Sequence, residues 1–293
     1  MKAFVFPGQG SQFPGMGYDL YKSNEKVKSL FNEADDILGF TLSNVMFNGT
    51  EEELKQTKIT QPAIFLHSIA ELIVLQETHL PNAVAGHSLG EFSSLVANNT
   101  ISFEDGLKLV FLRAKAMQKS CENSNGTMAA ILGLDDKIIK ETCESFDGNV
   151  TAANFNCPGQ VVISGESNAV KMICEKFNEI GARRSILLPV GGAFHSNLMN
   201  DAKSELKEAI HKTKFNNPTC PIYQNFTAQK TTSIDIIKEN LINQLTAPVL
   251  WTETINNMVN DGSLDYTEVG PGKVLQGLIR KINREAITQS VLS

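Results

Sequence analysis

The chain contains a GxSxG run, Gly86-His87-Ser88-Leu89-Gly90, whose serine hydroxyl could act as a nucleophile. The apolar segment Asn82 to Ala85 predicts a strand before the run, and Glu91 to Ala97 has helix-forming character after it. Such a strand, sharp turn and helix expose the serine on an elbow, at a helix N-terminus that stabilises negative charge on an attacked carbonyl oxygen. We therefore predict that Ser88 carries an acyl group as an ester. A plain glycine-bounded turn is the alternative.

A serine hydroxyl needs a base within hydrogen-bonding distance, and the chain has five histidines. His195 lies in a loop of small residues directly after a predicted strand, which is a usual position for a site residue. We predict that His195 is the base, with a structural histidine as the alternative. Of the other four histidines, His87 is adjacent to Ser88 but projects away from it, and His67 lies inside an apolar helix as a packed core residue. His79 and His211 lie near polar segments.

The elements around these residues predict an α/β protein. The first strand, Ala3 to Phe6, runs into the turn-rich loop Pro7–Gln12. Thr60, with a proline two positions later, is interpreted as the cap of a mostly apolar, largely buried helix over Ala63–Leu75. Apolar residues recur at helical spacing over Phe103–Lys119, which predicts a second long helix.

The middle of the chain changes character. Strands are predicted over 127–132, 150–154, 160–164 and 184–190, and helices over 135–146 and 168–180. The order βαββαβ is the split pattern of a ferredoxin-like unit. We therefore expect a large α/β-hydrolase-like subdomain with a parallel sheet (1–123 and 192–293) that carries an inserted ferredoxin-like subdomain (124–191).

Composition restricts the class of protein. A net charge of −6 and a pI near 5.5 argue against a general nucleic-acid surface. The five cysteines include no CxxC pair, which favours a reducing compartment. No apolar run approaches the length of a membrane helix. We expect a cytoplasmic monomer that binds no membrane; an organelle location after removal of a presequence stays open. No metal-ligand spacing is present, and we expect no metal and no cofactor.

Eight motifs follow one another along nearly the whole chain: FVFPGQGSQ, TQPA, AGHSLGEFSSLVA, RAKAMQ, NFNCPGQVVISG, LPVGGAFHSNLM, QLTAPVLW and EVGPGKVL. In this order and spacing they resemble the malonyl-CoA:acyl carrier protein transacylases of fatty acid synthesis and the related acyltransferase domains of polyketide synthases. The resemblance implies a dyad of Ser88 and His195 without an acidic third member, with the histidine oriented by a carbonyl around Gln244. It also implies an oxyanion hole formed by the backbone N–H groups of Gln9 and Leu89.

The resemblance assigns further residues to the substrate. Arg113 corresponds to the arginine that holds the malonyl carboxylate, and its planar fork suits a carboxylate. It borders the apolar stripe of its helix, so a snorkelling or salt-bridged arginine is the alternative. Asn154 and Gln160 match positions near the substrate and the pantetheine arm, or form turn and strand-edge hydrogen bonds. Phe194 matches an aromatic residue of malonyl-selective members, or belongs to the core.

The implied reaction moves a malonyl group from coenzyme A to Ser88 and then to the phosphopantetheine thiol of acyl carrier protein. A serine esterase or thioesterase is the first alternative, although such enzymes usually show the order Ser, Asp/Glu, His. A dinucleotide-binding module is the second, disfavoured because the third glycine of GxGxxG would fall at Phe13. An acidic carrier needs a local basic patch, for which the candidates are Arg183, Arg184, Lys171, Lys176, Arg280, Lys281 and Arg284.

Overall fold

The computed structural model describes residues 1–76 and 80–291. The strands are β1 (Lys2–Phe6), β2 (Ala83–Gly86), β3 (Gly126–Leu132), β4 (Val150–Cys157), β5 (Gln160–Glu166), β6 (Arg184–Leu187), β7 (Ile222–Tyr223), β8 (Lys230–Thr231), β9 (Asp265–Glu268) and β10 (Ile287–Ser290). The helices are α1 (Tyr18–Ser23), α2 (Glu25–Leu38), α3 (Leu42–Asn48), α4 (Glu51–Lys55), α5 (Thr57–Gln76), α6 (Gly90–Ala97), α7 (Phe103–Asn123), α8 (Asp136–Ser145), α9 (Ser167–Glu179), α10 (Asn200–Lys212), α11 (Ile234–Asn243), α12 (Trp251–Asn260) and α13 (Val274–Ile282), with short 3-10 turns η1 (Asn197–Met199) and η2 (Gln244–Thr246).

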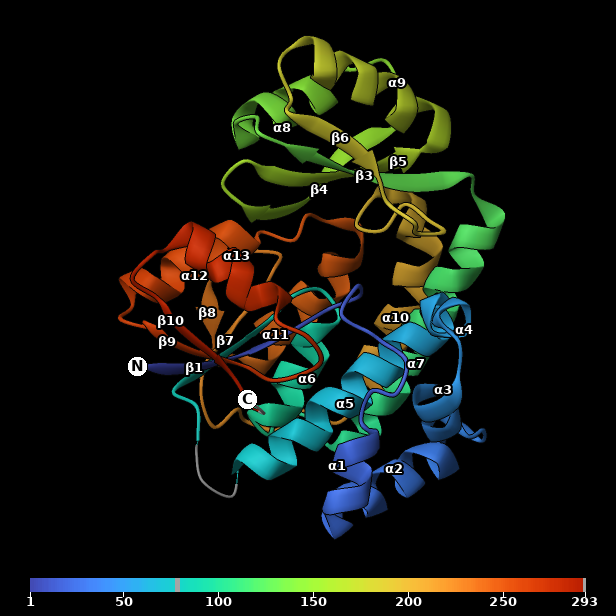
Figure 1. The fold of residues 1–293 in the computed structure, drawn as a ribbon, viewed down its shortest axis with the longest axis vertical. Coiled ribbons are helices and arrows are strands. Elements are labelled where there is room, and N and C mark those ends of the chain that lie inside the picture. The colour runs from blue at the N-terminus through green and yellow to red at the C-terminus, as the bar shows by residue number, and fades with distance from the viewer. Residues whose placement is uncertain (77–79, 292–293) are drawn as a thin grey trace.

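The larger sheet has the strand order β10-β9-β1-β2-β7-β8, and every neighbouring pair is parallel except β7 with β8. Its central strand β1 is apolar on both faces because both are covered. Phe4 and Phe6 pack with α5, α6 and α7, whereas Ala3 and Val5 pack with α12 and α13 (Figure 1). The prediction of an α/β protein with a parallel sheet is confirmed.

The second sheet is antiparallel, with the order β4-β5-β3-β6, and α8 and α9 pack on it (Figure 1). The chain order β3-α8-β4-β5-α9-β6 is the βαββαβ order expected. Strand β4 also reaches the rest of the chain, since Phe155 N donates to Val249 O (2.9 Å) and Val249 N to Ala153 O (2.8 Å). The subdomain boundaries at 124 and 191 stay a prediction.

Several predicted boundaries are wrong: α7 ends at Asn123 instead of Lys119, and β4 ends at Cys157 instead of Asn154. Helix α5 begins at Thr57, and Thr60 is not its cap: the Thr60 N–H donates to Gln56 O at 2.8 Å, so this residue already belongs to the helix. Its hydroxyl also bonds to that i−4 carbonyl, at 3.0 Å. Strand β6 ends at Leu187 instead of Val190, because Pro189 has no N–H to continue the ladder.

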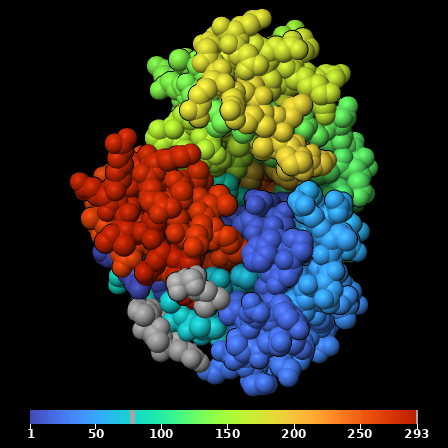
Figure 2. Space-filling view, viewed as in Figure 1, coloured from blue at the N-terminus to red at the C-terminus, as the bar shows by residue number. Residues whose placement is uncertain are grey.

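Helix α5 is confirmed as a largely buried helix. The prediction that no apolar run approaches the length of a membrane helix is wrong, because residues Thr57–Leu75 are long and apolar enough by length and composition alone; however, 72% of that window is buried inside the fold. It therefore has the character of a core helix. In the space-filling view, the N-terminal segments (blue) and the C-terminal segments (red) lie side by side, beneath the green and yellow part of the chain that contains the second sheet (Figure 2). The turn after β9 lies against the end of β1 and the loop after it: Val269 N donates to Val5 O at 2.9 Å, and a Cβ atom on Gly270 would lie 2.7 Å from the ring of Pro7.

Candidate active site

Ser88 lies on a tight elbow between β2 and α6, with a left-handed backbone (φ 52°) that is uncommon for serine. The flanking glycines are required by sterics. A Cβ atom on Gly86 would collide with the backbone of Gly90, and a Cβ atom on Gly90 would collide with the carbonyl oxygen of Phe6. The structure therefore places Ser88 on a strand-elbow-helix turn of the kind that the GxSxG pattern predicts.

His195 faces Ser88 directly, with 2.8 Å between His195 Nε2 and Ser88 Oγ. On the other side of the ring, Nδ1 lies 2.9 Å from the backbone carbonyl oxygen of Gln244. A carbonyl only accepts, so Nδ1 carries the proton and Nε2 is free to accept the serine proton. Burial, and then the charge of Arg113, lower the pKa of His195 to about 3. The imidazole is therefore neutral, which is the form a general base requires.

Arg113 lies on the buried apolar face of α7, as predicted, but it is fully buried beside the serine and is neither a snorkelling nor a salt-bridged surface residue. Its Nη2 donates to Ser88 Oγ (3.0 Å) and to Gln244 Oε1 (3.3 Å), and its Nη1 donates to Gln61 Oε1 (2.7 Å). Every acceptor is neutral, and no carboxylate of the described residues forms an ion pair with this guanidinium. Burial lowers the pKa of Arg113 to about 10, so the group stays a cation at neutral pH.

The loop after β1 lies against the elbow. A Cβ atom on Gly8 would come within 2.6 Å of the carbonyl oxygen of His87, so only glycine allows this approach. The side chain of Gln9 turns to Gln61, whose Nε2 donates to Gln9 Oε1 at 3.1 Å. Within the described part of the chain, neither the N–H of Gln9 nor that of Leu89 donates to an acceptor. Both remain available for a substrate oxygen.

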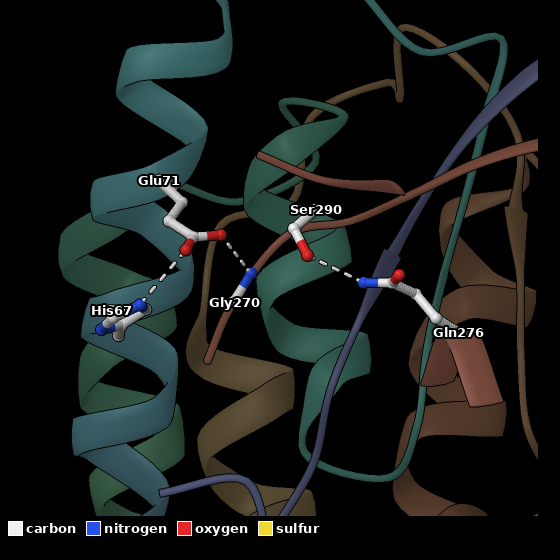
Figure 3. A network of polar contacts seen from close by, with 5 residues as sticks. All are labelled: His67, Glu71, Gly270, Gln276 and Ser290. Atoms are coloured by element: carbon white, nitrogen blue, oxygen red, sulfur yellow. Dashed lines mark hydrogen bonds and ion pairs between the residues drawn. The ribbon is translucent and has the colours of Figure 1, made fainter. Parts of the chain in front are cut away.

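A second polar network supports this loop from behind (Figure 3). The carboxylate of Glu71 accepts a hydrogen bond from Gly270 N at 2.6 Å and lies 3.3 Å from His67 Nε2. Gly270 packs against Pro7 so closely that an added Cβ would lie 2.7 Å from the proline ring. His67 is thus a buried structural histidine, as predicted.

Two further described histidines, His87 and His211, have side chains that do not contact the serine hydroxyl. His87 Nε2 lies 2.8 Å from Asn156 Oδ1, and the His87 ring is 5.6 Å from the ring of Trp251, so it projects across the elbow as predicted. Burial lowers its pKa. His211 is exposed on α10, and His79 lies outside the described residues.

Three predicted binding residues have different surroundings. Asn154 is buried in β4, and its Oδ1 has no hydrogen-bond partner among the described residues. Phe194 is buried next to His195 in the main core. Gln160 lies at the hairpin between β4 and β5, where its Oε1 accepts from Cys157 Sγ at 3.8 Å. No contact of the described residues brings Gln160 to Ser88, and the binding roles of all three stay predictions.

Sequence reasoning missed three buried residues around the serine: Gln61, Glu91 and Asn225. Asn225 Oδ1 accepts from Ser88 N (2.6 Å), and its Nδ2 donates to the carbonyl oxygen of Gly86 (2.7 Å). Asn225 follows the short strand β7, which pairs with β2. Polar residues at the carboxyl ends of neighbouring parallel strands are candidates for a site, and this signal could have identified Asn225.

Comparison with known proteins gives consistent results. A family model described as acyl transferase domain matches residues 3–291. The malonyl CoA-acyl carrier protein transacylase of Bacillus subtilis (strain 168) is 44% identical over 99% of this chain and 92% of its own length. An acyl carrier protein S-malonyltransferase from Vibrio cholerae is 40% identical, with a TM-score of 0.94 over 99% of this chain and 96% of that one. A malonyl-transacylase in complex with a type II polyketide synthase acyl-carrier protein gives a TM-score of 0.95 and 38% identity, over 99% and 95% of the two chains.

Proposed function

We propose, because this chain belongs to the malonyl CoA-acyl carrier protein transacylase family, that Ser88 takes a malonyl group from coenzyme A and passes it to the phosphopantetheine thiol of an acyl carrier protein. One observation supports the malonyl group above all others. The buried Arg113 guanidinium donates to the proposed nucleophile at 3.0 Å and has only neutral partners. A buried cation without a counter-charge in contact favours an anionic ligand.

The distance between the two groups suits malonyl. In a malonyl thioester the free carboxylate carbon is two bonds from the carbonyl carbon that the serine attacks. An arginine that contacts the serine oxygen can therefore contact the carboxylate of the same acyl group. An acetyl group has no such carboxylate, so Arg113 would distinguish the two acyl groups.

In the first half-reaction, His195 accepts the proton of Ser88 while the serine oxygen attacks the thioester carbonyl carbon. The negative charge that develops on the carbonyl oxygen is stabilised by the backbone N–H groups of Gln9 and Leu89. The carbon–sulfur bond then breaks, and His195 returns the proton to the departing coenzyme A thiol. Ser88 is left as the malonyl ester.

In the second half-reaction, His195 accepts the proton of the carrier thiol, whose sulfur attacks the ester carbonyl carbon. The same two N–H groups stabilise the oxyanion, and the carbon–oxygen bond to Ser88 breaks. The imidazolium of His195 returns the proton to the serine oxygen. The enzyme is regenerated, and neither half-reaction requires a metal or a cofactor. We propose that the protein carries out this transfer as a monomer in the cytoplasm, as a step of fatty acid synthesis.

The test is the intact mass of the protein after mixing with malonyl-CoA. We expect a mass increase of one malonyl group in the wild type and none in Ser88→Ala. Ser94→Ala is the matched control, because Ser94 is a buried serine of the helix that follows Ser88, and its hydroxyl donates to Gly90 O at 3.0 Å. An adduct that persists in Ser88→Ala would remove Ser88 from the mechanism. Rapid hydrolysis of malonyl-CoA without carrier protein would favour the esterase or thioesterase instead.

A further inference from the structure

Glu91 is a buried acidic residue that the mechanism above does not use. It lies in the first turn of α6, three residues after Ser88, and its side chain is inaccessible to solvent. Burial of a carboxyl group is unfavourable unless hydrogen bonds compensate. Its Oε1 accepts a hydrogen bond from the backbone N–H of Asn225. Glu91 is therefore attached to the residue that contacts Ser88.

Asn225 holds the elbow on both sides of the serine. Its Oδ1 accepts from the N–H of Ser88 at 2.6 Å, and its Nδ2 donates to the carbonyl oxygen of Gly86 at 2.7 Å. Its own backbone is fixed at both ends, because Glu91 accepts from its N–H and Leu250 N donates to its carbonyl oxygen at 3.1 Å. These two contacts hold the backbone of Asn225, and the hydrogen bonds of its side chain to Ser88 N and Gly86 O orient the amide.

The elbow requires such support. A serine with φ near 52° is in the left-handed region, which costs free energy and persists only where surrounding contacts hold it. The side-chain amide of Gln244 provides a second contact, since its Nε2 donates to the carbonyl oxygen of Ser88 at 2.9 Å. Because Asn225 occupies the N–H of Ser88, the next free N–H along the turn is that of Leu89.

We propose that Glu91 is a positioning residue for acyl transfer: through Asn225 it fixes the backbone of Ser88, so that the hydroxyl stays aligned with His195 and the N–H of Leu89 stays free for the substrate oxygen. This inference rests on the proposed function of Ser88 as the nucleophile. Glu91 itself touches neither the substrate nor the reacting atoms, so its effect is on the rate at which Ser88 reacts and not on the binding of malonyl-CoA.

The experiment measures the single-turnover rate at which malonyl-CoA acylates the full chain. Glu91→Ala removes the acceptor of the Asn225 N–H, and we expect the maximal rate to fall about 10- to 100-fold, the order expected when a reacting group is displaced by about 1 Å. Glu91→Gln keeps an acceptor oxygen, and its rate stays within about 3-fold of the wild type. The malonyl-CoA concentration at half-maximal rate is expected to change less than the rate does, because every hydrogen bond of Arg113 goes to a residue other than Glu91 and only the longer-range charge of Glu91 acts on the guanidinium.

Asn225→Ala and the double variant with Glu91→Ala show whether the effect passes through Asn225. If it does, the double variant reacts as slowly as Asn225→Ala and no more slowly. Ser94→Ala is the matched control in the same helix, with the wild-type rate expected. All rates are referred to folded protein, measured by near-UV circular dichroism, so that a loss of stability is separated from a loss of rate.

The inference is overturned by a wild-type rate in folded Glu91→Ala, or by losses that add in the double variant. A lowered melting temperature with an unchanged rate gives Glu91 a purely structural role and also overturns it. If malonyl-CoA leaves no adduct on the wild type, the proposed function fails. The same variants treated with an organophosphonate that modifies reactive serines still measure whether Glu91 sets the reactivity of Ser88.

Discussion

Replacement of Arg113 by alanine tests the acyl selectivity of the site. Arg113 presents two nitrogens, one 3.0 Å from the serine oxygen, and a carboxylate can accept from such a fork at two points. A hydrogen bond to a charged group contributes about 1.5–3 kcal/mol, and two contribute about 3–6 kcal/mol before exchange with the present neutral partners. If roughly half survives this exchange, about 1.5–3 kcal/mol of malonyl recognition remains, which corresponds to about 10- to 150-fold in rate.

The assay compares kcat/KM for malonyl-CoA and acetyl-CoA with carrier protein as acceptor. Arg113→Ala should lower the malonyl value about 10- to 150-fold more than the acetyl value, because only malonyl loses a carboxylate partner. Arg113→Lys keeps the positive charge without the two-pronged guanidinium, so its kcat/KM for malonyl-CoA should lie between those of the wild type and Arg113→Ala. Lys115→Ala is the control, since Lys115 is exposed on the same helix. Equal losses for both acyl groups would refute the carboxylate contact.

Three further predictions concern the elbow, its buried acid and the carrier. Gly90→Ala should lower the free energy of unfolding by at least about 3 kcal/mol, because its Cβ atom would collide with the carbonyl oxygen of Phe6. Gly277→Ala in α13, where a Cβ atom has open space, should stabilise the fold by about 1 kcal/mol. Chemical denaturation measures both changes. Burial raises the pKa of Glu91 to about 7, so the folded state binds its proton more tightly than the unfolded chain does. The contribution of Glu91 to the free energy of unfolding therefore falls by about 3 kcal/mol as the pH rises from about 4.5 to 7. Glu91→Gln should be more stable than the wild type at pH 8 but not at pH 4, which thermal melts at each pH measure. Arg183→Glu with Arg184→Glu, both exposed, should weaken carrier affinity at low salt more than at high salt, and a loss independent of salt would remove these residues from the docking face.

Local patterns were sufficient to predict the elbow, strands β1 and β2 and the four strands of the second sheet, because the elbow needs glycines at fixed spacing and these strands contain apolar runs. The two-residue strands β7 and β8 and the partly exposed edge strand β10 have no such run and were not predicted. The start of α5 was predicted wrongly because Thr60 has the composition of a cap, although its N–H already bonds within the helix. Capping statistics describe a residue and its nearest neighbours and do not show where a preceding segment ends. The end of β6 depended in the same way on a single missing N–H at Pro189.

The residues around Ser88 could be predicted only in part, since Gln61, Glu91 and Asn225 act through contacts between segments far apart in the chain. Gln61 lies 52 positions from Arg113, and Asn225 lies 137 positions from Ser88. Polar residues such as these follow no periodic pattern in the sequence. Their burial depends on a hydrogen-bond partner from a distant segment. Such a set becomes recognisable when the topology has brought the carboxyl ends of β1, β2 and β7 together.

Among the described residues, His195 is oriented by the backbone carbonyl of Gln244 and not by a carboxylate, and the contacts of Gln244 explain why. Gln244 presents its backbone oxygen to His195 at 2.9 Å and its side-chain oxygen to Arg113 at 3.3 Å, so one residue serves both groups with neutral acceptors. A carboxylate at this position would pair with the buried guanidinium and compete with the carboxylate of the substrate. It would also raise the pKa of the histidine, whereas burial and the charge of Arg113 keep it low. If Arg113 selects an anionic acyl group as proposed, a base oriented by a carbonyl avoids a competing carboxylate, and the neutral form of His195 follows from how the substrate is recognised.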